Sequence, residues 1–138
     1  MIMKAHVVFE ALHPAVPATL SRRALGEILR GELAYRGVVV SDDLDMKAIA
    51  HPIGAAEASV GAIEARCDAL LLCRDRANQE AAFEALVRAG ERSSALRARI
   101  GEASAAVRRL KQAAPPARPD VSVLGEGTAL LPELDPGA

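Results

Sequence analysis

The sequence predicts an α/β protein with a parallel sheet covered by helices. The run Val38–Val40 places three β-branched residues in succession without polar alternation, which is typical of a strand buried on both faces. A second apolar run lies between Cys67 and Cys73. Because these runs alternate with segments of helical periodicity, we expect parallel strands joined by right-handed crossovers.

The N-terminal third should contain a strand, a loop and a helix. Ala-His-Val-Val-Phe predicts the first strand at residues 5–9, and the two prolines that follow predict a loop over 10–20. Ser21 is a favoured N-cap for a helix over about residues 22–33. The apolar face of this helix consists of Leu25, Ile28, Leu29 and Leu33.

The middle strand is expected at residues 37–41 and should lead into a helical turn over 45–50. That turn ends before Pro52, because the residue preceding a proline avoids the helical conformation. A helix over about 55–65 then leads to the third strand at 67–73.

Two helices and a tail complete the pattern. The first helix is expected over residues 78–89, with a core face made of Phe83, Leu86 and Val87. The second is capped by Ser93 or Ser94 and extends to about Gln112, with apolar residues along one stripe: Leu96, Ile100, Ala103, Val107 and Leu110. Residues 113–138 contain five of the eight prolines and are expected to be a mostly disordered extension of a domain at 1–112.

Composition limits the classes of partner. The 138 residues carry 17 basic and 18 acidic side chains and only three aromatic ones, which argues against binding to nucleic acid or to an anionic membrane surface. No apolar stretch approaches the roughly 18 residues of a membrane span, and no signal peptide is evident.

The two cysteines predict a reduced, cytoplasmic protein. On one strand, Cys67 and Cys73 would lie about 20 Å apart, whereas a disulfide needs Cα atoms within roughly 7 Å. A chain with unpaired cysteines fits a reducing compartment. The three histidines, His6, His13 and His51, form no metal-ligand spacing with the cysteines, so we expect neither a metal site nor another cofactor.

Asp42 is the first carboxylate after the middle strand, and ligands of parallel α/β proteins bind beyond the carboxyl ends of strands. It is therefore a candidate catalytic residue, although a helix cap or turn acid is the structural alternative. Asp43 and Asp45 are expected to order the turn. The pair Asp43 and Asp45 also resembles the first motif of Mg²⁺-dependent haloacid-dehalogenase-type phosphatases. That alternative requires the strand to continue through Asp42, and no later Lys-plus-Asp-Asp site is evident.

Four segments carry a more specific resemblance. They are Ala-His-Val-Val-Phe-Glu-Ala-Leu from residue 5, Pro-Ala-Thr-Leu-Ser from 17, Leu-Arg-Gly-Glu-Leu from 29, and Gly-Val-Val-Val-Ser-Asp-Asp-Leu-Asp-Met-Lys-Ala-Ile from 37. In this order and spacing the sequence resembles bacterial β-N-acetylhexosaminidases of glycoside hydrolase family three, over about residues 3–112. The run from Cys67 to Cys73 is similar to the final barrel strand of that family.

The resemblance implies a fold and a site. The fold would be part of a (β/α)8 TIM-type barrel, with about three parallel strands, their helices and a further C-terminal helix. Asp42, directly after the serine, would be the nucleophile, and His6 and Met46 would bind the substrate. For His6, the residue type and the position on a strand favour an alternative role. In that role the histidine is half-buried and hydrogen-bonded to a neighbouring residue.

The implied reaction removes terminal N-acetylglucosamine from cell-wall-derived saccharides with retention, as in peptidoglycan recycling. The family's Lys-His-Phe-Pro-Gly-His-Gly segment and the His–Asp pair of its acid/base loop are absent from these 138 residues. The chain therefore reads as a fragment that is inactive alone, since a retaining mechanism needs a proton donor. The alternative is a non-catalytic remnant that associates with another chain through its open sheet edges.

Overall fold

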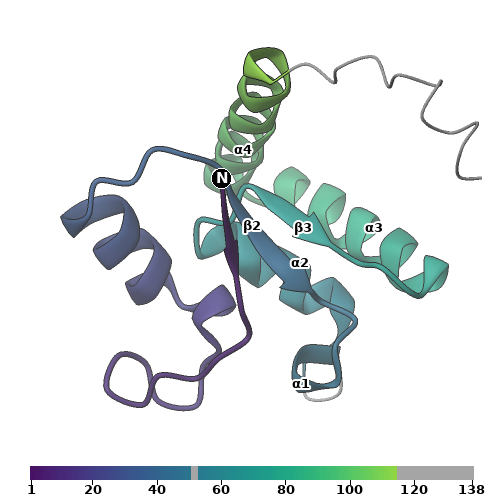
Figure 1. Cartoon of the computed structure of the whole chain (residues 1–138). Helices are drawn as coiled ribbons and strands as arrows, with labels where there is room; N and C mark the ends of the chain where they lie inside the picture. Colours follow the sequence, from purple (N-terminus) through teal and green to yellow (C-terminus); the bar gives the residue numbers. More distant parts are fainter. Residues whose placement is uncertain (51–52, 115–138) are drawn as a thin grey trace, which may run out of the picture.

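The computed structural model describes residues 1–50 and 53–114, so residues 115–138 of the predicted tail and His51 lie outside the described residues. The three strands form one parallel sheet in the order β1-β2-β3, which confirms the predicted α/β class (Figure 1). The elements are β1 (Ile2–Lys4), η1 (Ala18–Leu20), η2 (Arg23–Glu32), β2 (Val39–Asp43), α1 (Lys47–Ala50), α2 (Ala55–Glu64), β3 (Ala69–Leu71), α3 (Arg76–Arg92) and α4 (Ser94–Ala113).

The first strand lies closer to the N-terminus than predicted. Ile2 pairs with Val39, and the register continues as far as Lys4. The prediction of a strand over 5–9 was wrong because, in this register, a strand continuing to Phe9 would run past the end of β2. Val8 forms only an isolated antiparallel bridge with Pro17.

The other two strands differ from prediction at their ends. β2 continues two residues further than expected, to Asp43, while β3 is confined to Ala69–Leu71. The register between the two strands shifts between Val40 and Asp43. Within this shift the buried Ser41 side chain takes the role of a backbone acceptor, since its Oγ accepts a hydrogen bond from Leu71 N–H at 3.0 Å.

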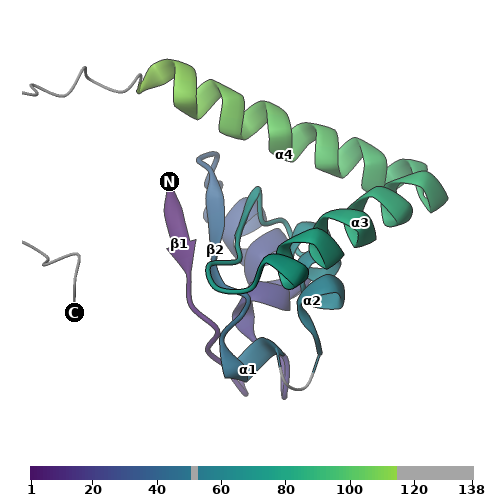
Figure 2. The same cartoon turned by 90° about the vertical axis from the view of Figure 1, so that its right-hand side faces the viewer.

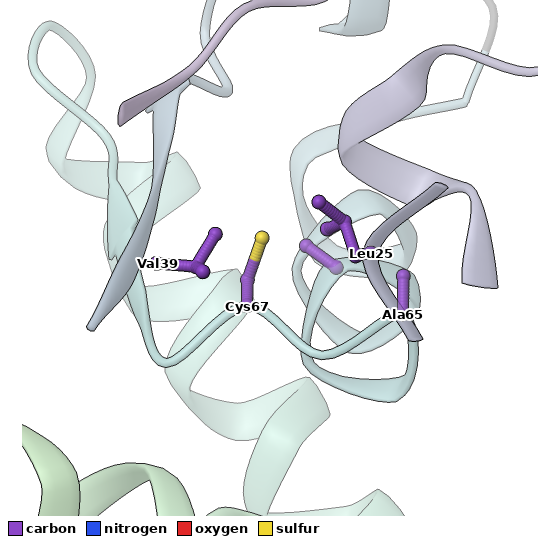
Figure 3. Packing of buried hydrophobic residues seen from close by; sticks show 5 residues of the cluster. Leu25, Val39, Ala65 and Cys67 are labelled. Carbon is purple, nitrogen blue, oxygen red and sulfur yellow. The ribbon is translucent and has the colours of Figure 1, made fainter. Parts of the chain in front are cut away.

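Helices η2 and α2 cover the same face of the sheet. The core cluster combines Leu25 of η2 and Val39 of β2 with Ala62, Ala65 and Cys67, all at most 2% exposed. Figure 3 shows Val39, Cys67 and Leu25 pointing toward one another. Figure 2 shows that α4 lies across the end of the sheet where β1 and β2 begin.

The predicted core face of α3 was partly wrong. Phe83 and Val87 are 68% and 45% exposed, whereas the small residues Ala82 and Gly90 are buried. Small side chains let α3 approach its neighbours closely, and α3 contacts both α2 and α4. The packed face is therefore the one with the smallest residues, and Phe83 and Val87 remain on the outside, whereas Leu86 is half-buried.

The predicted helix caps are present. Ser21 Oγ accepts a hydrogen bond from Ala24 N–H and Ser93 Oγ accepts one from Leu96 N–H, both at 3.2 Å, so each serine satisfies an unpaired donor of a first helical turn. Among the described residues, no helix combines the length and apolarity needed to cross a membrane.

Candidate active site

Asp42 lies at the carboxyl end of the middle strand, as predicted. Val39, three residues earlier, packs against the helices, and Asp42 itself lies in the stretch of β2 where the register with β3 shifts. The Asp42 side chain is half-buried. Its Oδ1 accepts a hydrogen bond from the backbone N–H of Asp43 at 2.8 Å, which gives the carboxylate a defined direction.

Asp43 connects three parts of the chain. Its Oδ1 accepts hydrogen bonds from Asp45 N–H and Cys73 N–H, each at 3.1 Å. Its carbonyl oxygen lies 3.0 Å from the Met46 nitrogen and 3.0 Å from His6 Nε2. The side chain thus joins the loops that follow β2 and β3, and the carbonyl joins the loop after β2 to the segment that follows β1.

Asp45 strengthens the same connection. Its Oδ2 accepts hydrogen bonds from Arg74 N–H at 3.1 Å and Asp75 N–H at 3.3 Å, and its Oδ1 accepts one from Asn78 Nδ2 at 2.8 Å. Burial by itself would raise the pKa of Asp45, but these hydrogen bonds and the Arg74 charge outweigh it and leave the pKa below its ordinary value. The expectation that Asp43 and Asp45 order the turn is therefore confirmed.

His6 has both ring nitrogens engaged within the chain. Nδ1 lies 2.9 Å from Thr19 Oγ1, and Nε2 lies 3.0 Å from the Asp43 carbonyl oxygen. The histidine is half-buried and bonded to neighbours, which is the alternative that the sequence favoured. With both nitrogens in use, the ring carbons of His6 are the part left for contact with a ligand.

Met46 and Cys73 flank the acidic turn. Met46 lies directly before α1 and is 40% exposed. Cys73 is exposed, and the pKa of its thiol is raised, first by local desolvation and then by the carboxylates of Asp43, Asp45 and Asp42. Sequence reasoning placed Cys73 on a strand and did not foresee its position beside the three acids.

Thr19 was also missed. It belongs to the quoted Pro-Ala-Thr-Leu-Ser segment, which was the available signal, and it is fully buried beneath His6.

The hydrogen bonds of Asp43 and Asp45 argue against the phosphatase alternative. β2 does continue through Asp42, as that reading requires. However, the Asp43 and Asp45 carboxylates, which would bind Mg²⁺, accept hydrogen bonds from N–H groups of the loops. Within residues 1–50 and 53–114, no group of three or more His, Cys, Asp or Glu side chains is arranged to hold a metal ion.

Comparison with known proteins identifies one family. Residues 1–110 match the model of the glycosyl hydrolase family 3 N terminal domain. A β-hexosaminidase from Pseudomonas aeruginosa (strain LESB58) is 50% identical over 88 residues, which cover 63% of this chain and 26% of that protein. The chain thus spans about a quarter of the length of this relative.

Solved structures agree with this match. A family 3 β-N-acetylglucosaminidase from Paenibacillus sp. str. FPU-7 aligns with a TM-score of 0.74 and 40% identity over 84% of this chain and 23% of that chain. The β-N-acetylhexosaminidase from Beutenbergia cavernae aligns with a TM-score of 0.72 and 29% identity over 80% and 32%, respectively. These similarities confirm the predicted fold class, a part of a TIM-type barrel with three parallel strands.

Proposed function

Because this chain belongs to glycosyl hydrolase family 3, we propose that it supplies part of the catalytic domain of a retaining β-N-acetylhexosaminidase. The names of its relatives support this activity, and Asp42 provides a residue able to perform it. The observation that carries the proposal is the contrast among the three acids after β2. Asp43 and Asp45 are engaged in structural hydrogen bonds, whereas Asp42 lies at the strand end with one carboxylate oxygen oriented by a single N–H.

Asp42 would act as the nucleophile. One of its carboxylate oxygens bonds to the anomeric carbon while the glycosidic C–O bond breaks, and the departing oxygen takes a proton from a general acid. Water then attacks the same carbon while the former proton donor, now a base, takes its proton; this displaces Asp42 and gives a product of retained configuration. The negative charge of the carboxylate also stabilises the oxocarbenium-like transition state.

The substrate would be a saccharide that ends in N-acetylglucosamine. We extend the proposal to cell-wall-derived saccharides, to a role in peptidoglycan recycling and to a cytoplasmic location, where the free thiols of Cys67 and Cys73 would remain reduced. His6 and Met46 would lie on the substrate side of Asp42. The exposed thioether of Met46 offers an adaptable apolar contact to the sugar.

A transplanted segment tests this proposal. Residues 1–110 replace the corresponding region of the P. aeruginosa relative, and hydrolysis of nitrophenyl N-acetylglucosaminide is measured. The hybrid should be active. The substitution Asp42→Ala should lower its rate of hydrolysis by a factor of at least about 10³, the order of effect known for loss of a nucleophile. Glu84→Ala, which removes an exposed acid on α3, is the matched control and should leave activity unchanged. An active Asp42→Ala hybrid would refute the assigned role.

The 138-residue chain alone should hydrolyse the same substrate at a negligible rate. General acid assistance typically contributes about 10²–10⁴-fold, and these residues lack the His–Asp pair of the family's acid/base loop. Robust turnover by the chain alone, lost in Asp42→Ala, would show that another group within it donates the proton.

A second candidate is association with another chain through the open edge of the sheet. An apolar groove of about 240 Å³ lies between β1 and η2. Its lining includes Ile2, Phe9 and Leu33, which are 36%, 47% and 68% exposed. Light scattering on the purified chain tests this candidate: self-association that Leu33→Lys abolishes would support it, and a monomer at all concentrations would argue against pairing with a second copy.

A further inference from the structure

We propose that His6 is a positioning residue that, through the main chain of Asp43, fixes the direction of the Asp42 carboxylate. The catalytic meaning of this inference rests on the proposed role of Asp42. His6 lies 37 positions before Asp43 in the sequence, yet its Nε2 is 3.0 Å from the Asp43 carbonyl oxygen. The contact joins the segment after β1 to the residue that follows the candidate nucleophile.

The contact defines the histidine tautomer. A carbonyl oxygen only accepts hydrogen bonds, so Nε2 must carry a proton. The Thr19 hydroxyl lies within donor distance of both Nδ1, at 2.9 Å, and the Ala5 carbonyl oxygen, at 3.2 Å, so in the neutral ring Nδ1 is the acceptor toward which its one proton turns. Because Thr19 is fully buried, the ring is held against a fixed part of the structure.

The contact to Asp43 persists when the ring gains a second proton. Nδ1 then donates to Thr19 Oγ1, and the hydroxyl turns to donate to the Ala5 carbonyl oxygen at 3.2 Å. Thr19 can serve as donor or acceptor, whereas Nε2 donates in both states. His6 therefore holds the Asp43 carbonyl irrespective of its own protonation.

Asp43 is held on three sides. His6 and the Met46 N–H occupy its carbonyl oxygen, and the N–H groups of Asp45 and Cys73 occupy its carboxylate. Its remaining polar group, the backbone N–H, donates to the carboxylate of the preceding residue at 2.8 Å. A residue held in this way keeps its N–H in one direction, so the carboxylate that accepts from it also keeps one direction.

Such orientation matters for a nucleophile, since misplacement of an attacking atom by about 1 Å can cost about 10²-fold in rate. A purely structural role, in which His6 only joins β1 to β2, leads to a different expectation. In that case any side chain that fills the space and bonds either partner would serve. The two nitrogens of His6 have different partners, so the two roles can be separated.

The test compares His6→Gln with His6→Asn in the isotopically labelled full chain. The Gln amide nitrogen falls near the position of Nε2 and retains a donor to Asp43, whereas the Asn amide falls near Nδ1 and retains only a partner for Thr19. His13→Gln is the matched control, because His13 also bonds a hydroxyl, that of Ser21, but does not contact the acidic turn. The readouts are the χ1 angle of Asp42 from three-bond couplings and the amide exchange rate of Asp43.

The wild-type chain, His6→Gln and His13→Gln should show one Asp42 rotamer and slow Asp43 exchange. His6→Asn should show averaged Asp42 couplings and Asp43 exchange faster by about five- to tenfold, as expected for loss of one hydrogen bond. Wild-type behaviour of His6→Asn, or equal changes in both His6 variants, would overturn the proposal.

If a variant fails to fold, a measurement on the unmodified chain still tests the proposal. Long-range ¹⁵N–¹H spectra should show the proton of the neutral His6 ring on Nε2, and a proton on Nδ1 alone would overturn the proposal. These readouts need no turnover. If Asp42 proves not to be the nucleophile, the orientation result stands as measured, and if the orientation result fails, the assignment of the nucleophile is untouched.

Discussion

Arg99 Nη2 lies 2.6 Å from Asp68 Oδ1 and also donates a hydrogen bond to the Cys67 carbonyl oxygen at 2.6 Å. The second carboxylate oxygen of Asp68 accepts from Arg30 at 2.6 Å and from Val39 N–H at 2.9 Å. One buried carboxylate thus connects η2, β2 and α4 at the start of β3. This end of the sheet is opposite to the end that carries the candidate active site. In barrel proteins, residues at this end contribute to stability rather than to catalysis.

Replacing Asp68 by Ala should destabilise the chain by about 3–5 kcal/mol, because it leaves the largely buried guanidinium groups of Arg99 and Arg30 without their counter-charge. Urea unfolding followed by circular dichroism measures this loss. Glu80→Ala is the control: Glu80 is 63% exposed and pairs with the exposed Arg76, so its loss should cost less than about 1 kcal/mol. A similar small loss for both variants would contradict the central role of Asp68.

The Asp45 carboxylate should stabilise the fold only above mildly acidic pH. Its pKa in the folded chain lies below the ordinary 3.8, so its contribution is complete at higher pH and is lost as pH falls through the lowered folded pKa. Asp45→Asn should therefore lower the unfolding free energy at pH 7 by about 1 kcal/mol, a modest value because water screens the partly exposed site. Unfolding curves from pH 7 to pH 2.5 should show the two proteins converging below about pH 4. A difference that grows in acid would show that the sign is wrong.

The two cysteines should differ in reactivity. Burial, followed by the charge of Asp68, raises the pKa of Cys67 to about 12, whereas Cys73 is exposed. At pH 8 a chromogenic disulfide reagent should therefore modify one thiol in the native chain and the second only on unfolding. Cys73→Ser should remove the fast phase. Equal rates for both thiols would mean that the packing around Cys67 opens readily.

The parallel order of the sheet was predictable because uninterrupted apolar strands separated by helices have few other solutions. The bounds of the first strand were not, because they depend on the register between Ile2 and Val39, which no local pattern encodes. Phe83 was assigned to the core because periodicity identifies an apolar face without showing what covers it.

The position of Asp42 could be predicted from the point where the middle strand ends. The contacts that orient it could not, because they join residues far apart in sequence. Cys73 meets Asp43 across 30 positions and His6 meets it across 37. Such contacts follow from strand pairing and loop geometry, and the local signal, an Asp after a strand, is the same for a catalytic acid and a turn acid.

The identity of the nucleophile is tested most directly by trapping the covalent intermediate. The hybrid enzyme carrying residues 1–110 is incubated with a fluorinated N-acetylglucosaminyl fluoride, which forms the glycosyl-enzyme faster than water removes it, and is then digested and analysed by mass spectrometry. We expect one peptide to gain the mass of the sugar, with fragmentation placing the added mass on Asp42. A sugar attached to another residue, or an active hybrid that never accumulates a labelled peptide, would contradict the account.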